Sequence, residues 1–138
     1  MLKVESFGII PFKQEGGAEW KVLLILHSKG RHWGFPKGKP NPNETPKESA
    51  QRELKEETGL EIDRFLADES IRETYQFVHQ KRPIFKTVCY FPAIVKGVVA
   101  LQVEEVREAK WVTVPEALSL LTFYEARQIL LQCQKLLP

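Results

Sequence analysis

Cysteine and long apolar runs are both scarce in this sequence of 138 residues. The two cysteines, Cys89 and Cys133, are too few and too far apart to indicate a disulfide framework or a zinc site. Each lies in an apolar stretch and is expected to be a buried thiol. No apolar run approaches the roughly 20 residues of a membrane span, and the first residues lack the pattern of a signal peptide. These features argue against a membrane protein and favour a cytoplasmic one.

The sequence also has no large excess of positive or negative charge. Lys and Arg total 20 against 18 Asp and Glu, for a net charge of +2, which by itself predicts neither a nucleic-acid nor a membrane partner. The basic side chains are instead concentrated in two segments, Lys29, Arg31, His32, Lys37 and Lys39 in the first and Lys81, Arg82 and Lys86 in the second. An anionic small molecule would explain both segments, and solvated loops are the alternative. Nothing in the sequence indicates an oligomeric state.

Length and a hydrophobic content of 43% predict one domain over residues 1–138. Short apolar or alternating segments predict strands, at residues 4–12, 20–27, 65–77, 84–95 and 110–114. A polar turn is expected at residues 13–17, and residues 22–26 are apolar throughout, which predicts a strand buried on both faces. After Pro115 we expect a short helix as far as Leu121 and a last helix over residues 122–137. Strands interleaved with helices predict an α/β fold with a mixed β-sheet.

A further helix is expected over residues 46–58. Thr45 is suited to its N-cap, with Pro46 at the first helical position and Glu48 closing a capping box. Gly59 is suited to the left-handed residue that ends such a helix.

Three glutamates, Glu53, Glu56 and Glu57, lie on one face of that helix, at i, i+3 and i+4. Like charges at this spacing repel by roughly a few tenths of a kcal/mol per pair. The last turn of a helix also favours cations over anions. A solvated acidic face, balanced by Arg52 and Lys55, is one interpretation. A bound divalent cation is the other, because magnesium takes oxygen ligands from carboxylates.

The glutamates belong to a longer pattern. Gly38 is followed by five residues and Glu44, and then by seven residues and the run RELKEETGL at 52–60. Every position of G-x5-E-x7-R-E-U-x-E-E-x-G-U, where U is aliphatic, is matched over residues 38–60. The sequence therefore resembles the Nudix hydrolases, and the resemblance implies a Nudix-type α/β/α sandwich. Asn43 stands where the family usually has glycine, which is a mild departure because asparagine tolerates left-handed geometry.

The resemblance implies roles for the residues of the motif. In Nudix enzymes the matching glutamates hold Mg²⁺ or Mn²⁺ against a pyrophosphate, and one carboxylate near the metal activates water. Glu56 and Glu57 are thus expected metal ligands, and Glu53 is a ligand or the general base. Arg52 orients these glutamates in the family, which agrees with ordinary pairing to Glu48 and Glu56 one helical turn away.

Two residues of the motif have supporting roles, and one residue outside it is a further candidate. Gly38 is expected to allow the loop before the helix its close approach, and Glu44 is expected either to brace that loop or to bind the metal peripherally. Many Nudix enzymes supply an extra glutamate six residues before an aromatic strand residue. That register, counted back from Trp111, selects Glu105 as a further metal ligand or the base. A solvent-facing acid in a charged loop is the alternative for Glu105.

The segment HWGFPKG at 32–38 indicates which group of Nudix enzymes the sequence resembles. It is similar to a loop of the asymmetrical diadenosine tetraphosphate hydrolases in which the residues matching His32 and Lys37 contact polyphosphate. The strand 86–90 resembles one that offers a phosphate-binding lysine, here Lys86. A lysine suits this role because it brings a compact charge and three hydrogen-bond donors to phosphate oxygens.

Those hydrolases also stack adenine between aromatic side chains. The candidates here are Tyr75, Phe77 and Tyr124, each of which would equally suit a hydrophobic core. The sequence thus predicts a magnesium-dependent enzyme that cleaves diadenosine tetraphosphate, a nucleoside polyphosphate, to ATP and AMP. The alternatives keep the chemistry with another nucleoside polyphosphate, a diphosphoinositol polyphosphate or 5'-triphosphorylated RNA. A nucleotide-sensing Nudix-like binding module would be expected to have lost glutamates that this sequence retains.

Overall fold

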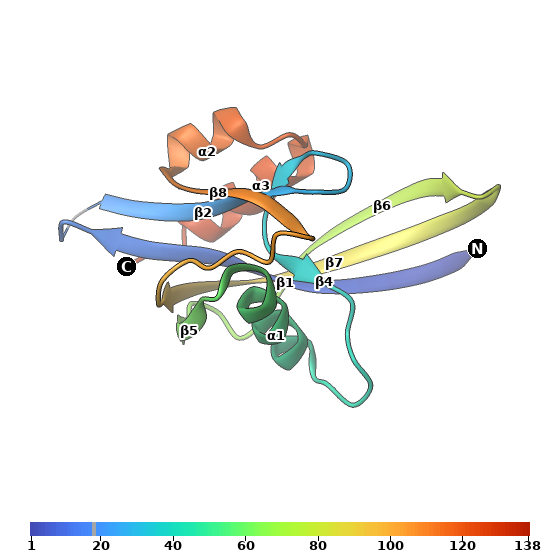
Figure 1. Cartoon of the computed structure of the whole chain (residues 1–138), viewed down its shortest axis with the longest axis horizontal. Coiled ribbons are helices and arrows are strands. Elements are labelled where there is room, and N and C mark those ends of the chain that lie inside the picture. Colours follow the sequence, from blue (N-terminus) through green and yellow to red (C-terminus); the bar gives the residue numbers. More distant parts are fainter. Residues whose placement is uncertain (18) are drawn as a thin grey trace.

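The computed structural model describes residues 1–17 and 19–138, which form eight strands and three helices (Figure 1). In chain order the elements are β1 (Leu2–Glu15), β2 (Glu19–His27), β3 (Trp33–Gly34), β4 (Lys37–Gly38), α1 (Pro46–Thr58), β5 (Glu61–Phe65), β6 (Ile71–His79), β7 (Arg82–Lys96), β8 (Val106–Thr113), α2 (Val114–Leu120) and α3 (Tyr124–Gln134). Within these residues, no helix is long and apolar enough to cross a membrane.

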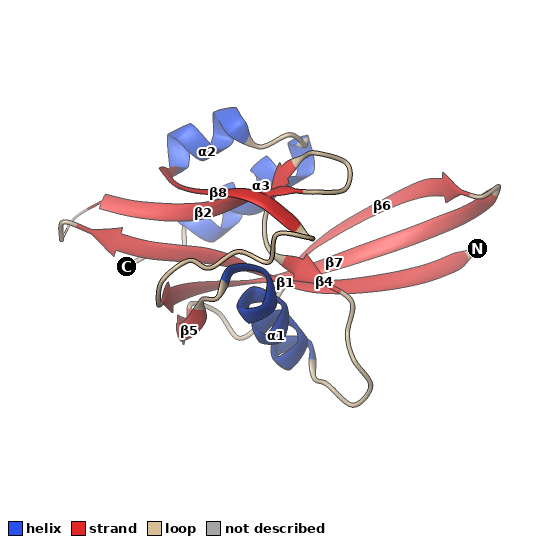
Figure 2. Ribbon diagram, in the orientation of Figure 1, coloured by secondary structure: helices blue, strands red, loops and turns tan. Residues whose placement is uncertain are grey.

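The sheet is mixed, as predicted, and β1 lies at its centre. β1 runs parallel to β7, from the pair Leu2 and Ile84 to the pair Phe12 and Ile94, and antiparallel to β2. β8 adds to β2, β5 and β6 each add to β7, and β4 pairs with β1 (Figure 2). This order brings the short strand β4, just before α1, onto the central strand.

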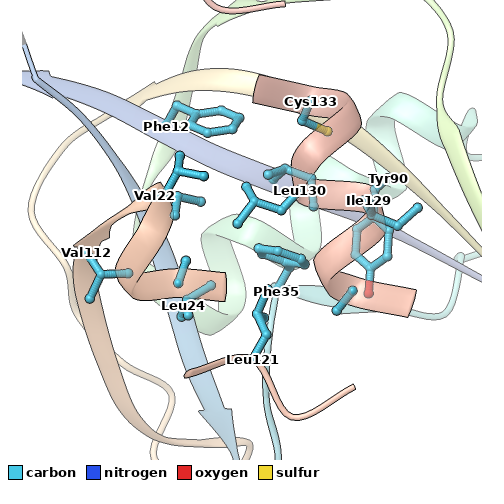
Figure 3. Packing of buried hydrophobic residues seen from close by; sticks show 14 of the residues in the cluster. Phe12, Val22, Leu24, Phe35, Tyr90, Val112, Leu121, Ile129, Leu130 and Cys133 are labelled. Atoms are coloured by element: carbon cyan, nitrogen blue, oxygen red, sulfur yellow. The ribbon is translucent and has the colours of Figure 1, made fainter. Parts of the chain in front are cut away.

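The helices cover both faces of the sheet, which confirms the predicted α/β/α sandwich. α1 packs against one face and α2 and α3 against the other (Figure 1). In β2, Val22 and Leu24 join the core beneath α2 and α3, whereas Leu23 and Ile25 join the core beneath α1. The apolar run of β2 is therefore buried on both faces, as predicted. Figure 3 shows the first of these cores from close by.

One end of the sheet extends beyond the helices as an arm made of β6, the start of β7 and the start of β1 (Figure 1). Gln80 and Lys81, both with positive φ, make its tight turn. Tyr75 of β6 pairs directly with Lys86 of β7, so their side chains share a face of the sheet. This pairing places a candidate aromatic beside a candidate phosphate ligand.

Some predicted boundaries are wrong. The strand predicted at 65–77 is two elements, because β5 ends at Phe65 and β6 begins at Ile71. Between them the Leu66 N–H donates to the Pro92 carbonyl and the chain then bends through the polar stretch 67–70. The turn predicted at 13–17 is shorter, because β1 continues to Glu15 in register with β2. β8 begins at Val106 rather than at residue 110. Its residues before 110 are already paired with β2, as the Leu26–Glu108 pair shows.

Candidate active site

The helix α1 begins and ends as the sequence predicts. The Thr45 hydroxyl accepts from the Glu48 N–H, and the Glu48 carboxylate accepts from the Thr45 N–H at 2.8 Å. Gly59 ends the helix in the left-handed region with φ 78°. These caps hold the last turn, and with it the three glutamates, in a defined position beside β4.

The three glutamates differ in exposure. The exposed fraction falls from 48% for the Glu56 side chain to 13% for Glu53, and Glu57 as a residue is 5% exposed. The acidic face is therefore not a uniformly solvated one: it extends inward from the surface to a buried carboxylate. A buried carboxylate without compensation is costly, which makes Glu57 the most informative residue of the motif.

Arg52 holds the outer carboxylates. Its Nη1 lies 2.9 Å from Glu53 Oε1 and 3.2 Å from Glu56 Oε2, and its Nη2 donates to the Lys39 carbonyl at 2.8 Å. It also forms a two-point ion pair with Glu44. The expected pairing with Glu48 is wrong, because the Glu48 carboxylate is committed to the helix cap.

Glu57 is positioned by the backbone of β4. The main-chain N–H of Lys37 donates to Glu57 Oε1 at 3.2 Å. Burial raises the pKa of Glu57 to about 8, with further increases from the charges of Glu53 and Glu105. The pKa of Glu53 is also raised, first by burial and also by Glu56 and Glu105, against the opposing effect of Arg52. Neighbouring carboxylates thus destabilise the charged forms of Glu53 and Glu57.

Gly38 has a specific steric reason to be glycine. A Cβ atom at this position would overlap the carboxylate of Glu53. Gly38 pairs with Phe7 of β1, so the loop before α1 is fixed by the sheet. The glycine therefore gives Glu53 the space in which its carboxylate lies.

Glu105 belongs to the loop before β8, far from α1 in the sequence. It immediately precedes β8, its side chain is exposed, and its carbonyl accepts from the Ser28 N–H at 2.9 Å. Its charge contributes to the raised pKa values of both Glu53 and Glu57. The structure thus brings Glu105 near Glu53 and Glu57, the two motif carboxylates that its charge affects.

The chemistry of this donor set fits a hard divalent cation. It consists of carboxylate oxygens, and Glu57 forms no ion pair within residues 1–17 and 19–138. Among the described side chains no three acidic, histidine or cysteine groups already converge as a closed ligand set.

A pocket of about 340 Å³ lies on the other side of Lys37. Six of the residues that line it have aromatic or imidazole side chains, namely His27, His32, Trp33, Tyr75, Tyr90 and Phe123. His32 stacks on His27 at 4.5 Å between ring centroids and lies 5.2 Å from the Phe123 ring. An apolar, aromatic lining with a few polar groups is typical of a site for a small molecule.

Some of the predicted substrate-binding residues lie at the pocket and others lie outside it. Lys37 and Tyr75 line the pocket with His32, and Lys86 lies near enough to Lys37 for the two positive charges to repel each other. Burial, followed by the charge of Lys37, lowers the pKa of Lys86 to about 8. Phe77 and Tyr124 do not line this pocket. Phe77 is 40% exposed farther out along the arm, with its ring 5.9 Å from that of Tyr75, and Tyr124 is 57% exposed at the start of α3.

Sequence reasoning missed other residues of the pocket. His27 ends β2, and burial, followed by the charges of His32 and Lys37, lowers its pKa to about 3. Glu73 of β6 and Glu125 of α3 also line the pocket. The alternation of β6 offered a signal for Glu73, because a residue two positions before Tyr75 shares its face of the sheet. No local pattern marks His27, whose environment is made by the distant segments around His32 and Phe123.

A mixed sheet between helices, with the complete motif on α1 and its preceding loop, defines a Nudix fold. The NUDIX domain family matches residues 2–133 of the chain. The chain belongs to this family and is a Nudix hydrolase.

Relatives and solved structures agree with this assignment. The asymmetrical bis(5'-nucleosyl)-tetraphosphatase of Rattus norvegicus is 36% identical over 113 residues, which cover 80% of this chain and 76% of the relative. The enzyme of that name in Caenorhabditis elegans is 26% identical, covering 92% of this chain and 91% of the relative. A C. elegans Ap4A hydrolase binary complex superimposes with a TM-score of 0.73 at 22% identity, covering 96% of each chain. The NUDIX domain of Shewanella oneidensis NrtR complexed with ADP ribose gives a TM-score of 0.80 at 16% identity, covering 98% of this chain and 88% of that one. At these identities the two structures support the fold alone.

Proposed function

We propose that this chain is a divalent-metal-dependent hydrolase that cleaves diadenosine tetraphosphate asymmetrically, adding water to release ATP and AMP. The observation that carries the proposal is the position of Lys37. Its backbone N–H binds Glu57 of the acidic site, while the same residue lines the aromatic pocket. One residue thus joins a candidate site for phosphoanhydride cleavage to a candidate site for a nucleoside.

Each part of the site has a role in this reaction. Glu53, Glu56, Glu57 and Glu105 would hold the metal. A bound Mg²⁺ or Mn²⁺ supplies neutralisation of phosphate charge and a bound water of lowered pKa. Arg52 positions Glu53 and Glu56 through its two ion pairs.

The remaining residues bind and orient the substrate. Lys37 and Lys86 place positive charge beside the pocket and would bind the phosphate oxygens that gain charge during the reaction. His32 and Tyr75 line the pocket in which a nucleoside would lie, and Phe77 extends the aromatic surface along the arm. Tyr124 stays a candidate for contact with the far end of a long substrate, because it is exposed beside Glu125. Fixing the polyphosphate between lysines and carboxylates would contribute the positioning part of the rate enhancement.

The relatives support the choice of substrate. Those from R. norvegicus and C. elegans are both named asymmetrical bis(5'-nucleosyl)-tetraphosphatases. The aromatic pocket also favours a substrate with a base over one that consists only of phosphates and a polyol.

The test is a product analysis. The purified chain is incubated with diadenosine tetraphosphate and Mg²⁺, with an EDTA control, and the nucleotides are separated by chromatography. Equal amounts of ATP and AMP, formed only with metal, are expected. Formation of two ADP molecules would contradict the asymmetrical cleavage. Failure to cleave this substrate alongside hydrolysis of a nucleoside triphosphate, a diphosphoinositol polyphosphate or triphosphorylated RNA would overturn the substrate assignment.

A further inference from the structure

The pocket has an acidic wall, which is unexpected beside a site for a polyphosphate. Glu73 of β6 and Glu125 of the first turn of α3 both line it. The side chain of Glu73 is half-buried, and within residues 1–17 and 19–138 it has no ion pair and accepts no hydrogen bond. Burial, followed by the charge of Glu125, raises the pKa of Glu73. A half-buried carboxylate to which no described protein group donates can accept a hydrogen bond from a ligand.

The positive charges lie on the other side of the pocket. Lys37 and Lys86 both lower the pKa of Glu73, so they are near enough to interact with it, yet neither lies within ion-pairing distance of it. Tyr75 lies between the two charge types along the sheet, because it pairs with Lys86 and shares a face with Glu73 two residues away. The pocket is therefore polarised from a basic end near Lys37 to an acidic end near Glu73.

A third polar group faces the same cavity. Nε2 of His27 is buried and has no hydrogen-bond partner among the described residues. Because the pKa of His27 is lowered to about 3, its ring is neutral at physiological pH. A neutral ring nitrogen does not add positive charge to the pocket, so it would not compete with the lysines for phosphate.

We propose that Glu73 is a specificity-determining residue that accepts a hydrogen bond from a donor on the nucleoside part of the substrate, and that Glu125 reinforces it. This inference rests on the proposed function, since it assigns an orientation to the nucleoside polyphosphate. The phosphate chain extends from Lys37 and Lys86 toward α1, and the donor-bearing nucleoside enters the acidic end. The donor is either the exocyclic amine of the base or a ribose hydroxyl.

Two consequences separate this arrangement from a generic polyphosphate site. A carboxylate binds a ligand that carries a hydrogen-bond donor more tightly than one that lacks it, because without a donor the carboxylate lone pairs are left unpaired. The same carboxylate repels phosphate, so the acidic end excludes ligands that are anionic throughout. Glu73 thereby selects nucleosides over inorganic polyphosphate or densely phosphorylated inositols.

The experiment measures binding, so that it does not depend on turnover. Dissociation constants of ATP, ITP, 2',3'-dideoxy-ATP and inorganic triphosphate are measured calorimetrically in EDTA for the wild type and for Glu73→Gln. ITP lacks the exocyclic amine, and the dideoxy compound lacks both ribose hydroxyls. The wild type is expected to bind ATP about ten-fold more tightly than whichever analogue lacks the recognised donor. In Glu73→Gln that preference should fall to about two-fold or less, while the affinity for inorganic triphosphate should rise.

Matched variants keep the result interpretable. Glu69→Gln removes an exposed carboxylate just before β6 and outside the pocket, and it should keep the wild-type preference. Glu125→Gln changes an exposed helix residue, and it should reduce the preference in the same direction even if Glu73→Gln folds poorly. An unchanged preference for both donors in Glu73→Gln and Glu125→Gln, or equal wild-type affinity for all three nucleotides, would overturn the proposal. Failure of the wild type to cleave diadenosine tetraphosphate with Mg²⁺ would instead refute the proposed function, and the two failures are distinguishable.

Discussion

Arg52 and Glu44 form a two-point ion pair, with Nε 2.7 Å from Oε2 and Nη2 3.1 Å from Oε1. The Glu44 carboxylate also accepts from the Asn41 N–H and the Ser49 hydroxyl, each at 2.7 Å. A planar guanidinium suits this bidentate contact, which a lysine cannot reproduce. The pair fixes the loop before α1 to the helix and leaves Nη1 of Arg52 to hold Glu53.

Acid should weaken this pair within a definite pH range. The Arg52 hydrogen bond, followed by those from Asn41 and Ser49, lowers the pKa of Glu44 to about 2. A depressed pKa in the folded state gives stability that is present above the unfolded value of 4.5 and is lost as pH falls through about 2. Glu44→Gln should therefore unfold at a lower temperature than the wild type at pH 7, and the difference should vanish near pH 2. Thermal unfolding followed by circular dichroism at both pH values measures this. A difference that persists at pH 2 would show that packing, and not charge, is responsible.

The effect of Glu57 on stability should depend on pH in the opposite direction to that of Glu44. Burial raises its pKa to about 8, so its contribution to stability is fully present below 4.5 and is lost as pH rises through about 8. In EDTA, Glu57→Gln should thus unfold several degrees above the wild type at pH 8 and at the same temperature near pH 4, because glutamine can still accept from the Lys37 N–H without a buried charge.

The same variant should be nearly inactive. If Glu57 is a metal ligand, as proposed, its removal is expected to lower kcat by at least about 100-fold. Glu48→Gln is the matched control, because Glu48 caps the same helix and glutamine also completes a capping box. It should keep kcat within about two-fold, in line with the small effects of ordinary surface changes. A stabilised Glu57→Gln that kept wild-type turnover would show that Glu57 is not part of the catalytic machinery.

Lys86 should impose an alkaline limit on substrate binding. Its pKa is lowered to about 8 by burial and by Lys37, so the side chain is charged below that pH and neutral above it. KM for the polyphosphate should be constant up to about pH 7 and then rise, approaching about ten-fold per pH unit well above 8. Lys86→Arg keeps the charge and should remove the rise, whereas Lys81→Arg at the exposed turn of the arm should not. A wild-type profile in Lys86→Arg would assign the titration to another group.

The parts of the fold and of the candidate site that the sequence predicts are those that depend on interactions between residues close in the chain. The caps of α1 and the apolar run of β2 are local signals, and the structure confirms both. The break between Phe65 and Ile71 has a local signal in the polar stretch 67–70, whose residues have low β propensity, and the prediction of one strand over 65–77 overlooked it. The motif located the acidic residues because it records their spacing on one helix and its loop.

The pocket was predicted less completely because its walls come from segments far apart in the chain. His27, Glu73 and Glu125 lie on β2, β6 and α3 and meet only in the folded protein. The environments of His27 and Glu73 are produced by burial, which no spacing in the sequence reveals. Glu73 illustrates the difficulty, since the alternation of β6 places it on the same face as Tyr75 but does not reveal that this face lines a cavity.

Gly38 offers a steric test of the position of Glu53. In Gly38→Ala the added Cβ would overlap the Glu53 carboxylate, so this side chain must move. We expect kcat to fall by at least about ten-fold, comparable to the loss of a group that supports a metal site. The unfolding temperature should change little, because Gly38 does not have a positive φ and alanine can adopt its backbone conformation. Gly16→Ala is the complementary control: its φ of 60° strains alanine, while within residues 1–17 and 19–138 no atom beyond the chain neighbours of Gly16 lies within 4 Å of the added carbon. It should lower the unfolding temperature and leave kcat unchanged. If Gly38→Ala retained full activity, the position of the Glu53 carboxylate beside Gly38 would be irrelevant to catalysis, and Glu53 would have to be removed from the proposed site.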